Sequence, residues 1–155
     1  MRKLALTVTI GAALISAGAV AVAQEARHPA VAARTSIMQL YQNSLMTLGA
    51  MAKGDVDYDA EAASKAAGNL GLLVQLDQST MWPQGTDTGS IDNTRALPAI
   101  WESFPDVMQK IETLSEAVAT MQEAAGTDLA SLQAAMGGIG GACSECHKSY
   151  RAPRN

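Results

Sequence analysis

The stretch LASLQAAMGGIGGACSECHKSYR (residues 129–151) carries both a helical repeat of apolar residues and the only two cysteines of the chain. Its apolar side chains recur every three or four residues, which places them on one face of an α-helix. The residues of this repeat are Leu129, Leu132, Met136, Ile139, Cys143, Cys146 and Tyr150. A capping signal precedes the repeat and Pro153 follows it. The spacing predicts a helix from Thr127 or Asp128 to near Arg151, with both thiols on its buried face.

Three further amphipathic helices precede this one, each with the same spacing of apolar residues. The first is expected over residues 29–54, with Pro29 in its first turn. The second is expected over residues 59–79. The third is expected over residues 94–124, with a kink or a restart at Pro105. Short connections before the second and fourth helices, and a long one before the third, predict an all-α antiparallel four-helix bundle.

The first 23 residues have the pattern of a cleaved secretory signal peptide. A basic start, MRK, precedes an apolar stretch, and AVA at residues 21–23 fits a signal-peptidase site. Cleavage after Ala23 would leave residues 24–155 as a single domain in the periplasm, with no membrane span. The alternative is an uncleaved anchor helix, which the small and polar residues within residues 4–22 disfavour.

Composition excludes one class of function and points to a non-protein group in the core. The chain has a net charge of −4, and loss of Arg2 and Lys3 leaves nine basic and 15 acidic residues, a net charge of −6. Nucleic-acid binding needs a basic face, so we expect no nucleic-acid partner. Aromatic residues make up 4% of the chain, which indicates that something other than large rings fills part of the interior. No nucleophile–base pair or carboxylate dyad indicates a hydrolytic enzyme.

Cys143 and Cys146, followed directly by His147, admit four interpretations. A disulfide would close a loop of one helical turn and would tie no distant elements together. A thioredoxin-like redox pair lies at a helix N-terminus, whereas this pair lies near a C-terminus. A zinc site needs four ligands, and the only other histidine, His28, lies near the start of the exported chain.

Covalent haem attachment is the interpretation that uses all three residues. C-x-x-C-H is the c-type haem motif. Two thiols about one helical turn apart can bond the two vinyl groups at one edge of the macrocycle. The histidine that follows can bind the iron. The motif therefore predicts one haem c per chain, attached through Cys143 and Cys146.

The chain resembles the class II c-type cytochromes, that is, the cytochrome c′ family and its low-spin relatives. In that family the haem motif lies near the C-terminus of the last helix of an antiparallel bundle. The resemblance covers essentially all of residues 24–155. It is carried by the segments RTSIM (34–38), LGAMAKG (48–54), MWPQG (81–85), AIW (99–101) and CSECHKSYR (143–151). It implies a four-helix bundle with one covalently attached haem and no enzymatic activity.

The resemblance also implies roles for individual residues. Cys143 and Cys146 would carry the thioether bonds, and His147 would be the proximal axial ligand of the iron. Arg151, one turn after His147, would lie beside the proximal imidazole. Arg34 would contact a haem propionate. The alternatives are a surface arginine at residue 34 and a solvated cation at a helix C-terminus at residue 151.

Met38 occupies the position that faces the distal side of the iron in the family. If its thioether binds the iron, a Met/His pair results, which raises the reduction potential and suits electron transfer. If Met38 only packs over the iron, the site is five-coordinate, high-spin and open to nitric oxide or carbon monoxide. Core packing alone is the simplest role for this methionine and agrees with the open site.

We therefore expect a periplasmic one-electron carrier that exchanges electrons with periplasmic redox partner proteins. The alternative is a high-spin cytochrome c′ that binds NO or CO, and a distant alternative is an exported helical binding module without haem. The acidic composition predicts basic patches on a redox partner. The resemblance implies a homodimer, with Ile37, Leu40 and Met51 of the first helix as candidate contacts.

Overall fold

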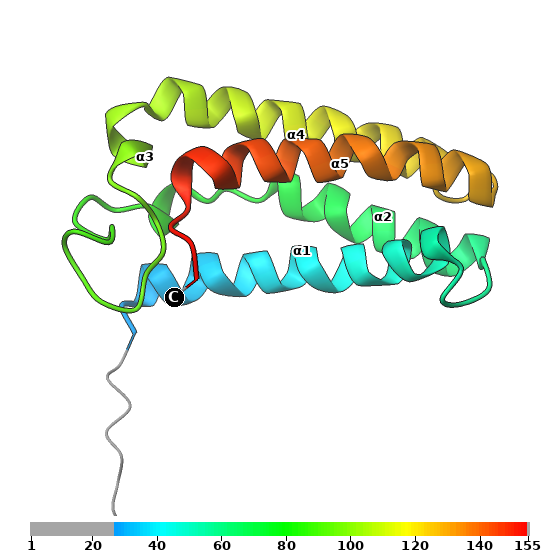
Figure 1. Ribbon diagram of the computed structural model, residues 1–155, viewed down its shortest axis with the longest axis horizontal. Helices are drawn as coiled ribbons and strands as arrows, with labels where there is room; N and C mark the ends of the chain where they lie inside the picture. Colours follow the sequence, from blue (N-terminus) through cyan, green and yellow to red (C-terminus); the bar gives the residue numbers. More distant parts are fainter. Residues whose placement is uncertain (1–26, 155) are drawn as a thin grey trace, which may run out of the picture.

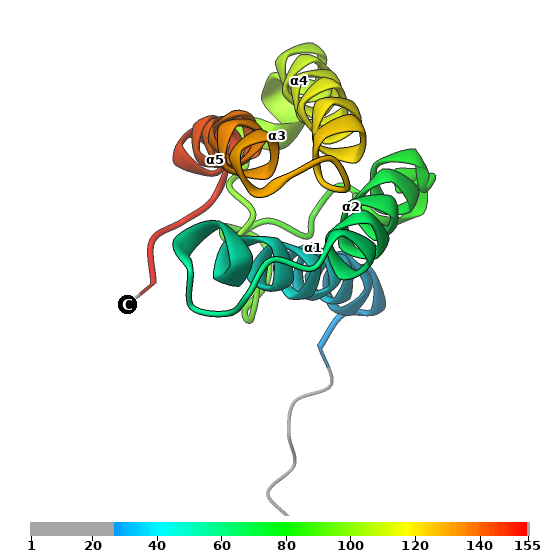
Figure 2. The same ribbon diagram turned by 90° about the vertical axis from the view of Figure 1, so that its right-hand side faces the viewer.

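The computed structural model describes residues 27–154 and shows an antiparallel bundle of four long helices (Figure 1). The elements are α1 (Pro29–Lys53), α2 (Ala60–Gln75), the short 3-10 helix η1 (Ser79–Met81), α3 (Ala99–Glu102), α4 (Phe104–Ala124) and α5 (Leu129–Tyr150). Viewed along the bundle, α1 neighbours α2 and α5, and α4 neighbours the same two helices (Figure 2). The expected fold class is confirmed. The predicted signal peptide, residues 1–23, lies outside the described residues.

Local signals set the ends of α1. The backbone N–H of Ala30 donates to His28 Nδ1 at 3.2 Å, so His28 caps the helix that Pro29 begins. Gly54 ends the helix in the left-handed region, with φ of 78°. A residue without a Cβ adopts this conformation at no steric cost. The predicted bounds of the first helix are therefore confirmed, and His28 has a structural role that the sequence did not indicate.

The second helix ends earlier than expected. Asp59 caps α2 as predicted, because its side chain accepts a hydrogen bond from Ala62 N–H at 3.0 Å. The helix stops at Gln75, because the next residue is extended and the Asp77 side chain accepts from Ser79 N–H at 2.9 Å. Such a local side-chain bond offers the backbone an alternative to the helix and begins a turn.

The prediction for the third helix is wrong about where the helix starts and is confirmed about where it breaks. Residues 94–98 are not helical. Residue 97 precedes Pro98, and a residue before proline is disfavoured in helical geometry. The short α3 ends at Glu102, and after Ser103 the chain begins α4 with Pro105 in its first turn, as the sequence predicted.

The main core runs along the centre of the bundle, and a smaller cluster closes the end that holds α3. The largest fully buried side chains of the main core are Leu48, Leu70, Val118, Met121, Leu132 and Ile139. The second cluster contains Ala96, Ile100 and Tyr150, with Trp82 and Trp101 packed beside them. The two tryptophans lie with ring centroids 6.4 Å apart. None of the described helices has the length and hydropathy needed to cross a membrane.

Two of the three residues that were predicted to contact a second chain are buried within the bundle. Ile37 is 4% exposed and Met51 is 2% exposed, and both belong to the main core. They stabilise the single chain and are not available to a partner. Leu40 is 53% exposed, so it is the only one of the three that can contact a second chain.

Candidate haem-binding site

The C-terminal third of α5 holds the cysteines and the histidine of the motif. Cys143 and Cys146 are half-buried free thiols, and His147 is half-buried beside them. Cys143 packs against the main core, and Cys146 packs against the smaller cluster. Both thiols therefore contact the interior of the bundle, as the helical spacing predicted. They do not form a disulfide.

The protonation states of these three side chains fit haem attachment better than thiol redox chemistry. Burial raises the pKa of Cys143 and of Cys146, and this outweighs the nearby cations that lower it. A redox-active cysteine pair instead needs a lowered thiol pKa. Burial lowers the pKa of His147, and the positive charges of Arg151 and Arg95 lower it further. The imidazole is therefore held neutral, which is the form that binds a metal ion.

Met38 lies on α1, in the N-terminal half of the helix. Tyr41, one turn further along α1, is buried in the main core that Cys143 borders. Burial raises the pKa of Tyr41 to about 12, and the proximity of Cys143 contributes to the shift. Met38 itself is a large apolar side chain that is 41% exposed. A large apolar side chain that is left exposed on α1 offers a place where a hydrophobic group can pack.

Arg34 is buried rather than exposed, and it anchors the long connection between α2 and α3. Its exposed fraction is 5%. Nη1 donates to Thr86 Oγ1 at 2.7 Å and to the Met81 carbonyl at 3.4 Å. Nη2 donates to the Thr86 carbonyl at 2.5 Å and to Thr94 Oγ1 at 2.6 Å. The guanidinium also stacks over the Trp82 ring, 4.9 Å from its centroid. The surface alternative for Arg34 is therefore wrong, and the propionate contact stays a prediction.

Arg151 and Arg95 lie together at the end of α5. The backbone N–H of Arg151 donates to the His147 carbonyl at 3.1 Å and closes the last turn of the helix. Arg151 also forms an isolated antiparallel bridge with Ala96. The Arg95 side chain donates from Nε to the Ala152 carbonyl at 2.8 Å. Sequence reasoning missed Arg95 because its position beside His147 depends on contacts 57 residues away.

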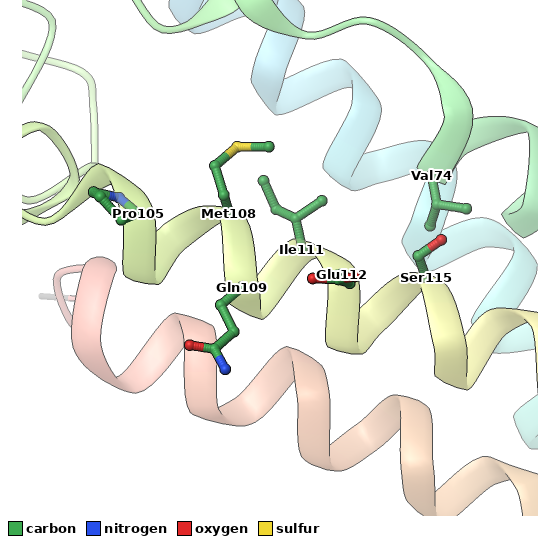
Figure 3. A pocket seen from close by; sticks show the side chains of 7 residues that line it. All are labelled: Val74, Pro105, Met108, Gln109, Ile111, Glu112 and Ser115. Carbon is green, nitrogen blue, oxygen red and sulfur yellow. The ribbon is translucent and has the colours of Figure 1, made fainter.

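A shallow cavity of about 560 Å³ lies elsewhere, between α2 and α4 (Figure 3). Val74 comes from α2, and the other lining residues come from the first half of α4. They are Pro105, Met108, Gln109, Ile111, Glu112 and Ser115. No residue of the predicted haem site lines this cavity. The predicted site residues belong to α1 and to the C-terminal end of α5. Within residues 27–154, no three His, Cys, Asp or Glu side chains lie close enough to hold a metal ion by themselves.

Comparison with known proteins agrees with this geometry. The family model described as Cytochrome C′ matches residues 29–151. Cytochrome c-554 from Cereibacter sphaeroides is 47% identical over 133 residues, covering 84% of this chain and 87% of that protein. Cytochrome c′ from the same organism is 38% identical over 154 residues, covering 99% of this chain and 100% of that protein.

Solved structures show the same fold. A cytochrome c′ from a Rhodobacter species superposes with a TM-score of 0.79 at 37% identity, covering 81% of this chain and 96% of that chain. A nitric oxide complex of a mutant cytochrome c′ from Alcaligenes xylosoxidans gives a TM-score of 0.69 at 29% identity, covering 80% of this chain and 94% of that chain. The C-x-x-C-H motif is consistent with the covalent haem c that the family implies. The chain belongs to the cytochrome c′ family of periplasmic, non-enzymatic haem proteins.

Proposed function

We propose that this protein is a one-electron carrier with a single haem c, in which Met38 and His147 are the two axial ligands of the iron. The proposal is carried by Met38, a large exposed thioether on α1 one helical turn before Tyr41, and Tyr41 belongs to the main core against which Cys143 packs.

The residues of the chain have separate tasks in this function. Cys143 and Cys146 would hold the haem by thioether bonds from two successive turns of α5. His147 would supply a neutral imidazole, and Met38 a thioether of low polarity. Haem, when bound, supplies an iron that is reversibly oxidised and reduced by one electron.

A second candidate function is the binding of nitric oxide or carbon monoxide. It is favoured by the nitric oxide complex of the related cytochrome c′ from Alcaligenes xylosoxidans. In this candidate Met38 packs over the iron without binding it. The two functions differ in one iron–sulfur bond, and the spectrum of the purified protein separates them.

Replacing Met38 is expected to change the coordination of the iron. We expect the protein itself to show a low-spin spectrum in both oxidation states, with no response to carbon monoxide. Met38→Ala removes the sixth ligand, so its spectrum should become high-spin and should respond to carbon monoxide. Absorption spectra of the oxidised and reduced proteins, with and without the gas, measure both effects.

Met46→Ala is the matched control for this experiment. Met46 lies on the same helix and is exposed, and its replacement should leave the spectrum unchanged. A high-spin, gas-responsive spectrum of the unaltered protein would contradict the electron-carrier proposal and would favour gas binding.

We further propose that the chain is exported with cleavage after Ala23. The mass of the exported protein should correspond to residues 24–155 plus one haem.

We also propose that the chain forms a homodimer. The exposed apolar side chains Leu40 and Met46 of α1 support a contact through this helix. Sedimentation should give a dimer, and Leu40→Glu should shift it toward the monomer. A monomeric unaltered protein at micromolar concentration would rule out the dimer.

A further inference from the structure

Tyr150 joins the last turn of α5 to the first turn of α4. Its hydroxyl donates to Asp106 Oδ2 at 2.6 Å, across 44 residues of sequence. Such a short distance is typical of a hydroxyl that donates to a charged carboxylate. The Tyr150 ring is buried in the smaller cluster at this end of the bundle, so its packing and its hydroxyl fix the side chain together. Figure 1 shows the start of α4 and the end of α5 at this end.

The acceptor, Asp106, is held by the helix on which it lies. Its backbone N–H donates to the Ser103 carbonyl at 3.0 Å, where α4 begins. A carboxylate is favoured in the first turn of a helix, because the free N–H groups there carry partial positive charge. The next residue, Val107, packs against the same cluster as Tyr150. The acceptor oxygen therefore sits on a short side chain whose backbone is fixed.

The turn of α5 that Tyr150 ends also carries part of the cysteine–histidine motif. Cys146 lies four residues before Tyr150, so the two side chains share a face of the helix. Cys146 also packs against the cluster that contains Tyr150. The backbone N–H of Arg151 donates to the His147 carbonyl at 3.1 Å, so His147 belongs to the same last turn. A movement of Tyr150 relative to α4 therefore moves Cys146 and His147 with it.

The bond between Tyr150 and Asp106 gives this turn a direction that packing alone does not. Within residues 27–154, it is the only side-chain hydrogen bond that joins α4 to α5. A hydrogen bond has a preferred distance and angle, whereas apolar contacts are non-directional. A separate backbone contact, from Leu97 N–H to the Tyr150 carbonyl at 3.1 Å, does not involve the hydroxyl. Removing the hydroxyl therefore leaves the end of α5 attached but frees its orientation relative to α4.

We propose that Tyr150 and Asp106 are a positioning pair, whose hydrogen bond sets the orientation of the α5 turn that carries Cys146 and His147. Neither side chain is a ligand in this role, and both act through the backbone of α5. Contacts behind a ligand fix its orientation, and the orientation of an imidazole affects how it binds a metal ion. The inference rests on the proposed haem attachment through this motif and deepens the proposed electron-carrier function.

Three variants separate the hydrogen bond from the packing around it. Tyr150→Phe removes only the hydroxyl and keeps the ring in the cluster. Asp106→Leu removes the acceptor at a similar size, and Asp106→Asn keeps an acceptor oxygen without the charge. The electron paramagnetic resonance spectrum of each oxidised holoprotein reports the geometry of the axial ligands. Thermal unfolding gives the stability of each variant.

We expect Tyr150→Phe and Asp106→Leu to shift or broaden the resonance signal in the same way. Asp106→Asn should stay close to the unaltered protein, because the tyrosine hydroxyl still has an acceptor. The double variant, Tyr150→Phe with Asp106→Leu, should show no larger change than either single variant, because the two side chains act as one unit.

Tyr58→Phe is the matched control, at the other end of the bundle. The Tyr58 hydroxyl donates to the Ala125 carbonyl at 2.8 Å, so this variant also loses one tyrosine hydrogen bond between distant segments. It should lower the melting temperature to a similar degree and leave the resonance signal unchanged. Lys110→Gln controls for the ion pair within α4, in which Lys110 Nζ lies 3.8 Å from Asp106 Oδ2, and should also leave the signal unchanged.

Two results would overturn the positioning role. One is a Tyr150→Phe variant with a lowered melting temperature and an unchanged signal, which would make the pair a fastening contact only. The other is a signal that changes in Tyr150→Phe but not in Asp106→Leu, because the hydrogen bond would then not be the cause. If Asp106→Leu does not fold, Asp106→Ala carries the same comparison.

The same spectra distinguish a failure of the positioning role from a failure of the proposed function. Matching changes in Tyr150→Phe and Asp106→Leu, in a protein that proves to be high-spin and gas-responsive, would support the positioning role while the electron-carrier function fails. Unchanged signals in a low-spin protein would do the reverse. A colourless exported protein would overturn both.

Discussion

Replacing both cysteines, Cys143→Ala together with Cys146→Ala, is expected to abolish stable holoprotein. Both thiols are half-buried and face the interior of the bundle from successive turns of α5. The haem that they would hold contributes apolar volume between the helices, in a chain in which few aromatic side chains can replace it. Haem staining of the denatured protein should be lost completely, and thermal unfolding should lose its cooperativity or shift to a much lower temperature.

Single replacements and a neighbouring residue provide the controls. Cys143→Ala or Cys146→Ala alone leaves one thioether bond, so a reduced amount of covalent haem should remain. Ser144→Ala changes an exposed position of the same turn and should leave haem content and stability unchanged. A double variant that is folded, cooperative and colourless would show that the bundle does not depend on haem.

Replacing Arg34 is expected to destabilise the protein by about 2–4 kcal/mol, because several charge-assisted hydrogen bonds are lost at one buried site. Arg34→Ala removes the donors to Thr86, Thr94 and the Met81 carbonyl, and it leaves buried acceptors without partners. Arg34→Lys should be intermediate, because a single ammonium group cannot reach four acceptors in a plane. Urea unfolding of the holoprotein, followed by circular dichroism, measures the loss.

Arg27 is the matched control for Arg34. It is an exposed arginine just before α1, and Arg27→Ala should change the free energy of unfolding by less than about 0.5 kcal/mol. An Arg34→Ala variant as stable as the Arg27→Ala variant would mean that the connection between α2 and α3 folds without this anchor. A loss of stability with an unchanged haem spectrum would assign Arg34 to the connection rather than to the haem.

The sequence predicted dimer contacts on the first helix at residues that the structure buries, and the reason is the number of helices packed around α1. Ile37 and Met51 flank the apolar stripe of α1, so the helical repeat left them open to a dimer contact. In the bundle, α1 packs against both α2 and α5, so its buried face is wider than one stripe. Of these three residues, only Leu40 stays exposed. The width of a buried face depends on how many helices surround it, and one helix does not carry that information.

The sequence by itself determined the four long helices, the break at Pro105 and the haem motif. Each of these features depends on residues that lie within a few positions of one another. Helical periodicity and capping residues indicate the helices, and a proline indicates the break. The haem motif consists of two thiols one helical turn apart, followed directly by a histidine. Only the tertiary structure decided the tasks of Arg34 and Arg95. The hydrogen-bond partners of Arg34 lie 47 to 60 residues away, and the partner of Arg95 lies 57 residues away. An arginine's flexible stem allows many positions for its charge, and the packing of the connection before α3 against α1 and the C-terminus selects one of them.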